Sequence, residues 1–397
     1  MTHAPNTDLD TGPDTGLDTG LQDDAPRDDA SVEDLRLDHV ELYVEDLDRK
    51  VADWTGGYGF AVVGTAGSPA EGFRSVALRQ GRILLVLTES TTDEHPAAAY
   101  VHSHGDGVAR IALRAPDVAA VFDHAVRHGA RPLAEPVRHE GPGVVVTATV
   151  SGFGDVVHSL VQRAEEDPSG LPEGFAPVDA AVDGPHAQGG RPSADLPGLV
   201  EVDHFAVCVN IGELDDTIAF YRQALGFREI FEERIVVGTQ AMLSKVVQSR
   251  SGDITFTVIQ PDPVADAGQI DEFLKNHDGA GVQHIAFSSD DAARSVRTLG
   301  GAGVEFLTTP ATYYELLGQR VRLRKHDLAE LGELNILVDE DHGGQLFQIF
   351  TRSTHARRTL FFEVIERLGA ETFGSSNIKA LYEAVELERH RENGWSR

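Results

Sequence analysis

The sequence of 397 residues contains a single cysteine, Cys208, so no disulfide can form within the chain. Small extracellular domains usually depend on disulfides, and the lack of them favours a reducing, cytoplasmic location. We interpret Cys208 as a small buried residue in the middle of a strand. Long apolar runs are missing too: no stretch approaches the roughly 20 residues of a membrane-spanning helix, and no signal peptide opens the chain. We therefore expect a cytoplasmic protein with no membrane partner.

Basic residues are scarce as well. Only 34 Lys and Arg stand against 64 Asp and Glu, which gives a formal net charge of −30. A surface of this sign repels nucleic acid and anionic lipid, so neither is expected as a partner. Residues 1–35 hold ten Asp and Glu but one Arg, repeat Asp-Thr-Gly, and lack apolar periodicity. We interpret residues 1–35 as a disordered acidic tail.

The rest of the sequence repeats itself. Alternating, strand-like segments in one half match segments in the other. The matching pairs are 37–44 with 202–209, 107–113 with 281–287, and 159–163 with 363–367. Between the copies, residues 164–198 are rich in Pro and Gly, as is typical of a linker. The sequence thus predicts two copies of one domain, at residues 36–163 and 199–390.

Two histidines and one carboxylate lie in apolar, strand-like runs of the second copy: His204, His284 and Glu363. A carboxylate among such neighbours is costly to desolvate unless a positive group lies beside it. Two imidazoles and one carboxylate are the ligand set that leaves half an octahedron open on Fe(II). Their spacings of 80 and 79 residues are too long for a zinc-finger clip and suit ligands brought together by a barrel. Spacing alone does not name the metal, and an ion pair with Arg367 is the structural alternative for Glu363.

The first copy provides an internal comparison. At the three matching positions it has His39, Arg110 and Ser159. Arginine does not lose its proton to bind a metal, and serine is a poor substitute for a carboxylate. We therefore predict one metal site per chain, in the second copy, with the first copy as a scaffold.

Longer motifs carry a resemblance to a known family. They lie at residues 202–204, 279–286, 339–351, 361–367 and 373–381. In these motifs, and over residues 37–390 as a whole, the chain resembles the 4-hydroxyphenylpyruvate dioxygenase family of vicinal-oxygen-chelate enzymes. The resemblance implies an α+β fold of tandem βαβββ modules that form two open β-barrels, with the metal in the C-terminal barrel. It also implies a C-terminal lid helix, and Ile378, Leu381, Tyr382 and Val385 follow helical spacing.

The same resemblance implies a cofactor and substrates. The cofactor is Fe(II), and the partners are 4-hydroxyphenylpyruvate and O2. Because the substrate carries its own 2-oxo acid, no external 2-oxoglutarate is needed. The resemblance leaves a homodimer open and does not fix the oligomeric state.

The family has two branches, which form homogentisate or 4-hydroxymandelate from this substrate. Homogentisate-forming members typically have Pro where Thr257 stands, Asn at Ile259, Gln at Glu366 and Phe at Ile378. All four departures agree with the hydroxymandelate-forming branch. An Asn amide can hold a phenol hydroxyl, whereas Ile can neither donate nor accept a hydrogen bond. We therefore expect benzylic hydroxylation, a step that the resemblance links to antibiotics containing hydroxyphenylglycine.

The resemblance also implies the pocket residues. Ile259 and Ile378 are expected to influence the product, and the remaining polar and aromatic candidates are Ser244, Thr257, Gln269, Gln283, Gln348, Phe350, Phe362 and Phe373. Formation of homogentisate is the nearest alternative. Extradiol cleavage of a catechol uses the same ligands, but the Gln-rich interior and the C-terminal motif disfavour it. A metal-free binding protein of this fold is a third alternative, although such proteins usually lack the ligand set.

Overall fold

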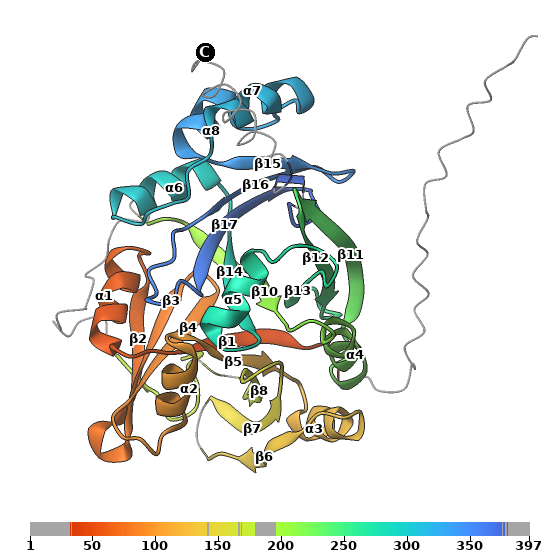
Figure 1. The fold of residues 1–397 in the computed structure, drawn as a ribbon. Coiled ribbons are helices and arrows are strands. Elements are labelled where there is room, and N and C mark those ends of the chain that lie inside the picture. The colour runs from red at the N-terminus through yellow and green to blue at the C-terminus, as the bar shows by residue number, and fades with distance from the viewer. Residues whose placement is uncertain are drawn as a thin grey trace, which may run out of the picture.

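Two large mixed β-sheets, packed against each other, make up the molecule (Figure 1). The computed structural model describes residues 32, 34–140, 143–165, 167, 169–178, 196–374, 376, 377 and 379. The first sheet belongs to the N-terminal half and the second to the C-terminal half. Each sheet has helices on its flanks.

The first half comprises eight main strands and their helices. In chain order these are β1 (Arg36–Tyr43), α1 (Leu47–Gly56), β2 (Ala61–Ser68), the short helix η2 (Pro69–Glu71), β3 (Phe73–Gln80), β4 (Ile83–Ser90), α2 (Pro96–His104), β5 (Gly107–Arg114), α3 (Val118–Arg127), β6 (Pro132–Arg138), β7 (Val144–Ser151) and β8 (Val157–Arg163).

The second half repeats this order with two further helices. Its elements are β10 (Leu199–Cys208), α4 (Leu214–Ala224), β11 (Arg228–Val237), β12 (Gln240–Gln248), β13 (Thr255–Pro261), α5 (Gln269–His277), β14 (Gly281–Ser289), α6 (Ala292–Gly301), α7 (Ala311–Arg320), α8 (Leu328–Leu334), β15 (Leu337–Glu340), β16 (Gln345–Phe350) and β17 (Phe361–Leu368).

The strand order confirms the predicted fold. The sheets run β6-β7-β8-β5-β1-β4-β3-β2-β9 and β11-β12-β13-β10-β14-β17-β16-β15, which is one order read in opposite directions, with β9 added to the first. β1 pairs parallel with β4 and antiparallel with β5, and β10 pairs in the same way with β13 and β14. Each half therefore contains two βαβββ modules, and each described sheet curls without pairing its first strand to its last.

Aspartates begin the equivalent helices of several modules. Asp46, Asp117 and Asp291 precede α1, α3 and α6, and each side chain accepts a hydrogen bond from the backbone N–H three residues further on. These caps satisfy N–H groups that the first helical turn leaves unpaired. The duplication is therefore visible in local signals as well as in strand order.

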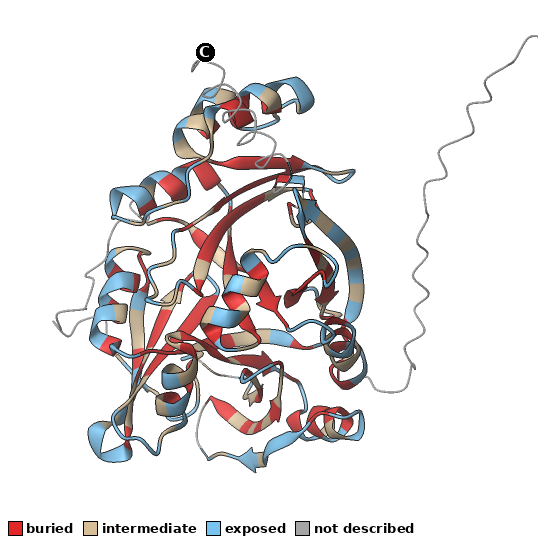
Figure 2. Ribbon diagram, in the orientation of Figure 1, coloured by how far each residue is buried: buried red, intermediate tan, exposed pale blue. Residues whose placement is uncertain are grey.

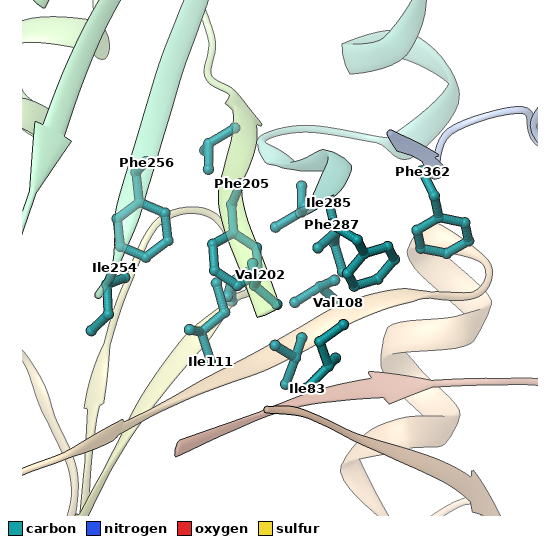
Figure 3. Packing of buried hydrophobic residues seen from close by; sticks show 14 of the residues in the cluster. Ile83, Val108, Ile111, Val202, Phe205, Ile254, Phe256, Ile285, Phe287 and Phe362 are labelled. Atoms are coloured by element: carbon teal, nitrogen blue, oxygen red, sulfur yellow. The ribbon is translucent and has the colours of Figure 1, made fainter. Parts of the chain in front are cut away.

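The main hydrophobic core lies between the two sheets. Val108 and Ile111 of β5 belong to the same buried cluster as Phe205 of β10 and Ile285 and Phe287 of β14 (Figure 3). Because successive side chains of a strand point to opposite faces, residues next to these in sequence face the concave sides of the sheets. The core thus directs the predicted metal ligands away from the interface between the halves. Cys208 is buried in its strand, as predicted.

The predicted tail and linker are ordered at their edges. Val32 and Leu35 are buried, at 6% and 0% exposure, and a Cβ on Gly226 would lie 2.6 Å from Val32. Within the predicted linker, β9 (Ala176–Pro177) pairs with β2. Ala176 and Pro177 therefore extend the first sheet, which the Pro and Gly content of this segment did not suggest. Most of the tail, residues 1–31, and the middle of the linker, residues 179–195, lie outside the described residues, and the domain boundaries stay a prediction.

Burial follows the two sheets. Strand β13 is buried at every residue, whereas β11, at the edge of the second sheet, alternates between exposed and half-buried residues (Figure 2). Within the described part of the chain, no helix is long and apolar enough to cross a membrane. The predicted cytoplasmic location stays a prediction.

Candidate metal centre and substrate pocket

The three predicted ligands come from neighbouring strands of the second sheet. His204 on β10 pairs in register with Ala286 on β14, and Ala286 pairs with Glu363 on β17. His284 precedes Ala286 by two residues and so faces the same side. Glu363 Oε2 lies 3.5 Å from His204 Nε2 and 3.3 Å from His284 Nε2. Side chains that are up to 159 residues apart in sequence therefore present their ligand atoms within 4.8 Å of one another.

Asp203 and Arg367 fix the orientation of His204. Asp203 Oδ1 lies 2.8 Å from His204 Nδ1, and Arg367 donates to both carboxylate oxygens of Asp203 at 2.8 Å. Burial alone would raise the pKa of Asp203, but the hydrogen bonds from Arg367 and His204 outweigh it and lower the pKa. A carboxylate at Nδ1 leaves Nε2 free to bind a metal, which is the usual arrangement for a ligating histidine.

Aromatic side chains surround His284. Its ring stacks on Phe361 with centroids 4.9 Å apart and meets the edge of Phe350 at 5.7 Å. Burial lowers the pKa of His284, while the adjacent Glu363 opposes this shift. His284 Nδ1 is buried and has no hydrogen-bond partner among the described residues, so on that side aromatic packing holds the ring.

The corresponding place in the first half contains a cation of the chain itself. His39 pairs with Ala112, and Ala112 pairs with Ser159, as their counterparts do in the second half. Arg110 Nη1 donates to Ser159 Oγ at 2.5 Å, and Arg110 Nε lies 2.8 Å from Glu41 Oε2. The equivalence of these positions is therefore confirmed. That only the second half binds a metal stays a prediction.

The Asp–His–Arg network is also duplicated. Asp38 Oδ1 lies 2.7 Å from His39 Nδ1, and Arg163 donates to both oxygens of Asp38 at 2.6 and 2.7 Å. The Asp–Arg pair is therefore present in both halves. The second half differs in having a second histidine and a glutamate beside the first histidine.

A second cluster of potential ligands is an ion-pair network. Asp291, His326 and Glu366 lie close together. Glu366 already accepts hydrogen bonds from Lys325 Nζ at 2.6 Å and from the backbone N–H of Ala292 at 2.8 Å, and its Oε2 lies 2.9 Å from His326 Nε2. Because an ammonium group occupies one oxygen, this cluster is better explained as structural pairing.

Thr257 and Gln348 present unpaired polar atoms beside the ligands. Thr257 pairs with Ala206, which pairs with His284, so the three lie side by side on β13, β10 and β14. Gln348 lies two residues from Phe350, the register partner of Glu363, on the same face of β16. Thr257 Oγ1 and Gln348 Oε1 are buried without a hydrogen-bond partner among the described residues. A substrate can satisfy both atoms.

Gly374 allows Gln348 its position. It has a φ of +74°, and a Cβ there would lie 2.1 Å from Gln348 Oε1. Only glycine tolerates both conditions. The Phe373-Gly374 motif therefore permits a close approach of the chain to the pocket wall.

Ser244 and Ile259 continue the wall away from the metal ligands. They are register partners on β12 and β13 and are 3% and 8% exposed. Ile259 packs with Cys208, Met242, Ile270 and Phe273. Its surroundings are apolar, as predicted from the lack of an amide at this position.

Gln283 and Gln269 differ in placement. The register shifts between Ala206–His284 and Val207–Val282, which leaves Gln283 as an extra residue in β14. Such a bulge re-aims a side chain next to a functional site, and Gln283 is 8% exposed. Gln269 is the first residue of α5 and is exposed. No described contact brings Gln269 into the pocket wall.

Phe350 and Phe373 lie against the ligands, but Phe362 does not. The Phe373 ring is 5.3 Å from that of His204. Phe362 faces the interface between the halves, where its ring lies 4.8 Å from Trp54 and 5.8 Å from Phe287. The prediction of Phe362 as a pocket wall is therefore wrong, because it alternates with Glu363 along β17. Phe361, which has the same parity as Glu363, occupies that place and could have been found from period-two alternation.

A cavity of about 950 Å³ adjoins this site. It is lined by Asp203, Gln248, Thr255, Arg367 and Phe373, among others, and does not include the three ligands themselves. Two of its lining residues, Asp203 and Phe373, contact His204, so the cavity lies next to the predicted ligands.

Comparisons with known proteins agree with this geometry. The family model described as glyoxalase/bleomycin resistance protein/dioxygenase superfamily matches residues 201–349, and that of the N-terminal domain of hydroxyphenylpyruvate dioxygenase matches residues 54–175. A 4-hydroxyphenylpyruvate dioxygenase of Yarrowia lipolytica is 32% identical, over 89% of this chain and 91% of its own. The chain belongs to the 4-hydroxyphenylpyruvate dioxygenase family.

Other members of the family fall on both sides of the product question. The 4-hydroxyphenylpyruvate dioxygenase of Dictyostelium discoideum is 31% identical, over 89% of this chain and 98% of its own. A solved triple mutant of 4-hydroxymandelate synthase from Streptomyces coelicolor is 43% identical, with a TM-score of 0.77 and coverage of 89% of this chain and 98% of that one. Family membership therefore establishes a dioxygenase, but it does not determine which product forms.

Of the four positions that the resemblance links to the product, Glu366 lies away from the pocket wall and Ile378 is outside the described residues. Glu366 lies on the opposite face of β17 from Glu363 and pairs with Lys325 and His326, so it does not touch the pocket wall. Ile378 and the predicted lid residues Leu381, Tyr382 and Val385 lie outside the described residues. Among these four positions, Thr257 and Ile259 are therefore the two that the structure places in the pocket wall.

Proposed function

We propose that the chain catalyses the Fe(II)- and O2-dependent oxidative decarboxylation and benzylic hydroxylation of 4-hydroxyphenylpyruvate to 4-hydroxymandelate and CO2. The observation that carries the choice of product is the apolar cluster around Ile259. A pocket without an amide at this position offers no hydrogen bond there to the ring. The 43% identity to a 4-hydroxymandelate synthase supports the same choice.

The donor set fits Fe(II). His204, His284 and Glu363 would hold the ion on one side and leave the other side for substrate and O2. The two imidazoles are neutral donors, and the single carboxylate leaves a net positive site for an anionic 2-oxo acid. The bound ion would supply the redox chemistry with O2, which no side chain of the protein can provide.

The residues of the chain orient the substrate and exclude water. Thr257 Oγ1 and Gln348 Oε1, which have no hydrogen-bond partner among the described residues, are positioned to hydrogen-bond a bound molecule beside the ligands. Phe350, Phe361 and Phe373 surround the two histidines with apolar surface. A dry, shaped site limits side reactions.

Homogentisate formation on the same substrate is the second candidate. It is favoured by the curated relatives, which are named as 4-hydroxyphenylpyruvate dioxygenases. A metal-free binding protein is disfavoured by the convergence of three ligand atoms on one point. A role in antibiotic biosynthesis depends on the first candidate.

Product analysis separates these functions. The protein is loaded with Fe(II), and O2 uptake and CO2 release are measured with 4-hydroxyphenylpyruvate and no 2-oxoglutarate. Because 4-hydroxymandelate and homogentisate have the same mass, the product is identified by its chromatographic retention against both standards. A product that co-elutes with homogentisate contradicts the proposal, and no turnover without 2-oxoglutarate contradicts both candidates.

A further inference from the structure

Glu233 on β11 faces the concave side of the second sheet. It pairs in register with Ser244 on β12, and Ser244 pairs with Ile259 on β13. Register partners lie on the same face of a sheet. Ile235, two residues further along β11, packs into the cluster around Ile259. Glu233 therefore lies on the pocket side, in the row that contains Ser244 and Ile259.

The side chain of Glu233 has an unmade hydrogen bond. Its Oε2 atom is buried and has no hydrogen-bond partner among the residues that the structure describes. Two basic residues of the same hairpin are paired with other carboxylates. Lys245 Nζ lies 2.9 Å from Asp215, and Arg234 Nε donates to Asp262 at 2.6 Å. Burying a carboxylate oxygen without a donor is unfavourable. This arrangement leaves one buried oxygen of the half-buried Glu233 available to a donor on a bound ligand.

An aromatic hydroxyl is a donor that suits this position. The metal ligands lie on β10, β14 and β17, and β13, β12 and β11 follow β10 across the sheet. A 2-oxo acid bound at the ligands leaves the aromatic end of the molecule to extend along the concave face. A ring that extends toward β11 brings its para substituent to the row of Glu233, where Ile259 offers no polar atom.

We propose that Glu233 accepts a hydrogen bond from the ring hydroxyl of the substrate and sets the preference for 4-hydroxylated over unsubstituted arylpyruvates. The proposal rests on the function proposed above and adds a specificity-determining residue to it. A phenol O–H is a good donor to a carboxylate, and such charge-assisted bonds are stronger than neutral ones. A site built for a hydroxyl discriminates strongly against an analogue that lacks it, because the buried acceptor is then left unpaired.

The test compares two substrates in variants of the full-length Fe(II)-loaded protein. We expect Glu233→Leu to lower kcat/KM for 4-hydroxyphenylpyruvate at least about tenfold, with little loss for phenylpyruvate. Glu233→Gln keeps an acceptor oxygen and should recover part of the preference. Glu232→Leu is the matched control, since Glu232 is the adjacent, exposed residue on the other face of β11. It should leave the ratio of the two substrates unchanged.

Binding without turnover provides a second readout. Under anaerobic conditions, the Kd of each of the two arylpyruvates is measured by calorimetry. In Glu233→Leu, only the binding of 4-hydroxyphenylpyruvate should weaken. Equal losses for both substrates, or an unchanged ratio of Kd values, would overturn the role of Glu233. If the wild type neither binds nor turns over either arylpyruvate, the proposed function itself fails. A wild type that turns over 4-hydroxyphenylpyruvate with an unaffected Glu233→Leu variant rejects this inference alone.

Discussion

Phe361 and Phe362 are neighbours in β17, yet we expect their replacement by alanine to affect different properties of the protein. Phe362 is 6% exposed, and its ring lies among those of Trp54, Tyr58 and Phe287, at 4.8, 5.5 and 5.8 Å. Truncation of a buried phenylalanine to alanine typically costs about 3–5 kcal/mol, because the lost burial is compounded by a cavity. Phe362→Ala should therefore lower the free energy of unfolding by an amount comparable to much of a typical protein's stability.

Phe361 should show the opposite pattern. It is half-buried and contacts His284 in a stacked arrangement at 4.9 Å, a type of ring pair that contributes about 0.5–1.5 kcal/mol. Phe361→Ala should cost less stability than Phe362→Ala. It should reduce turnover of 4-hydroxyphenylpyruvate and weaken Fe(II) binding, because His284 Nδ1 has no hydrogen-bond partner among the described residues and the stacked Phe361 ring helps to hold the imidazole in place.

Urea unfolding followed by circular dichroism measures the first effect, and O2 uptake with metal titration measures the second. Each variant serves as the control of the other, since they differ by one position along the same strand. If Phe362→Ala unfolds at the wild-type urea concentration but loses turnover, the assignment of the two faces of β17 is wrong. The same conclusion follows if Phe361→Ala leaves both iron affinity and turnover intact.

The remaining predictions concern the metal, the product and pH. Glu363→Ala should abolish turnover and iron binding, whereas Arg110→Ala should keep one iron per chain; metal analysis that finds two irons in the wild type contradicts this. Ile259→Asn should shift product toward homogentisate or a related ring-oxidised compound, since about 1.4 kcal/mol changes the ratio tenfold and one hydrogen bond to the ring is of that size; an unchanged chromatogram rejects that cause. Stability should fall as the pH drops from about 6.5 toward 4, by up to about 1.4 kcal/mol for each unit between the folded and unfolded pKa, and a flat pH profile of the urea midpoint contradicts it. In that range the unfolded chain takes up protons that the folded chain does not, because burial, above all, lowers to about 4 the pKa of His158, His277 and His355.

Sequence periodicity singled out three residues that the structure brings together, because imidazoles and carboxylates are rare in apolar strands. His204, His284 and Glu363 stand out as polar residues among buried ones, and the duplication supplies their matched positions. The same alternation, applied one residue further, would have chosen Phe361 over Phe362. Phe362 lies in the motif that resembles the family, but it points to the opposite face of β17 from Glu363.

Other features depend on contacts that no local pattern encodes. The bulge at Gln283 arises from a register shift between two strands, and the pairing of Glu366 with Lys325 joins residues 41 positions apart. β9 adds to the first sheet although Ala176 and Pro177 resemble linker. In the sequence Glu233 does not differ from many other acidic residues. Its register with Ser244 places it on the concave face of the second sheet.

Arg110 has a consequence for how the chain responds to iron supply. In the first half the guanidinium of Arg110 lies between Glu41 and Ser159 and is a permanent positive charge of the polypeptide itself. In the second half Glu363 faces the imidazoles of His204 and His284, and the permanent cation nearby, Arg367, is paired with Asp203. If the second half binds Fe(II) as proposed, loss of the metal should destabilise that half, whereas the first half keeps the pairing of Arg110 with Glu41 and Ser159.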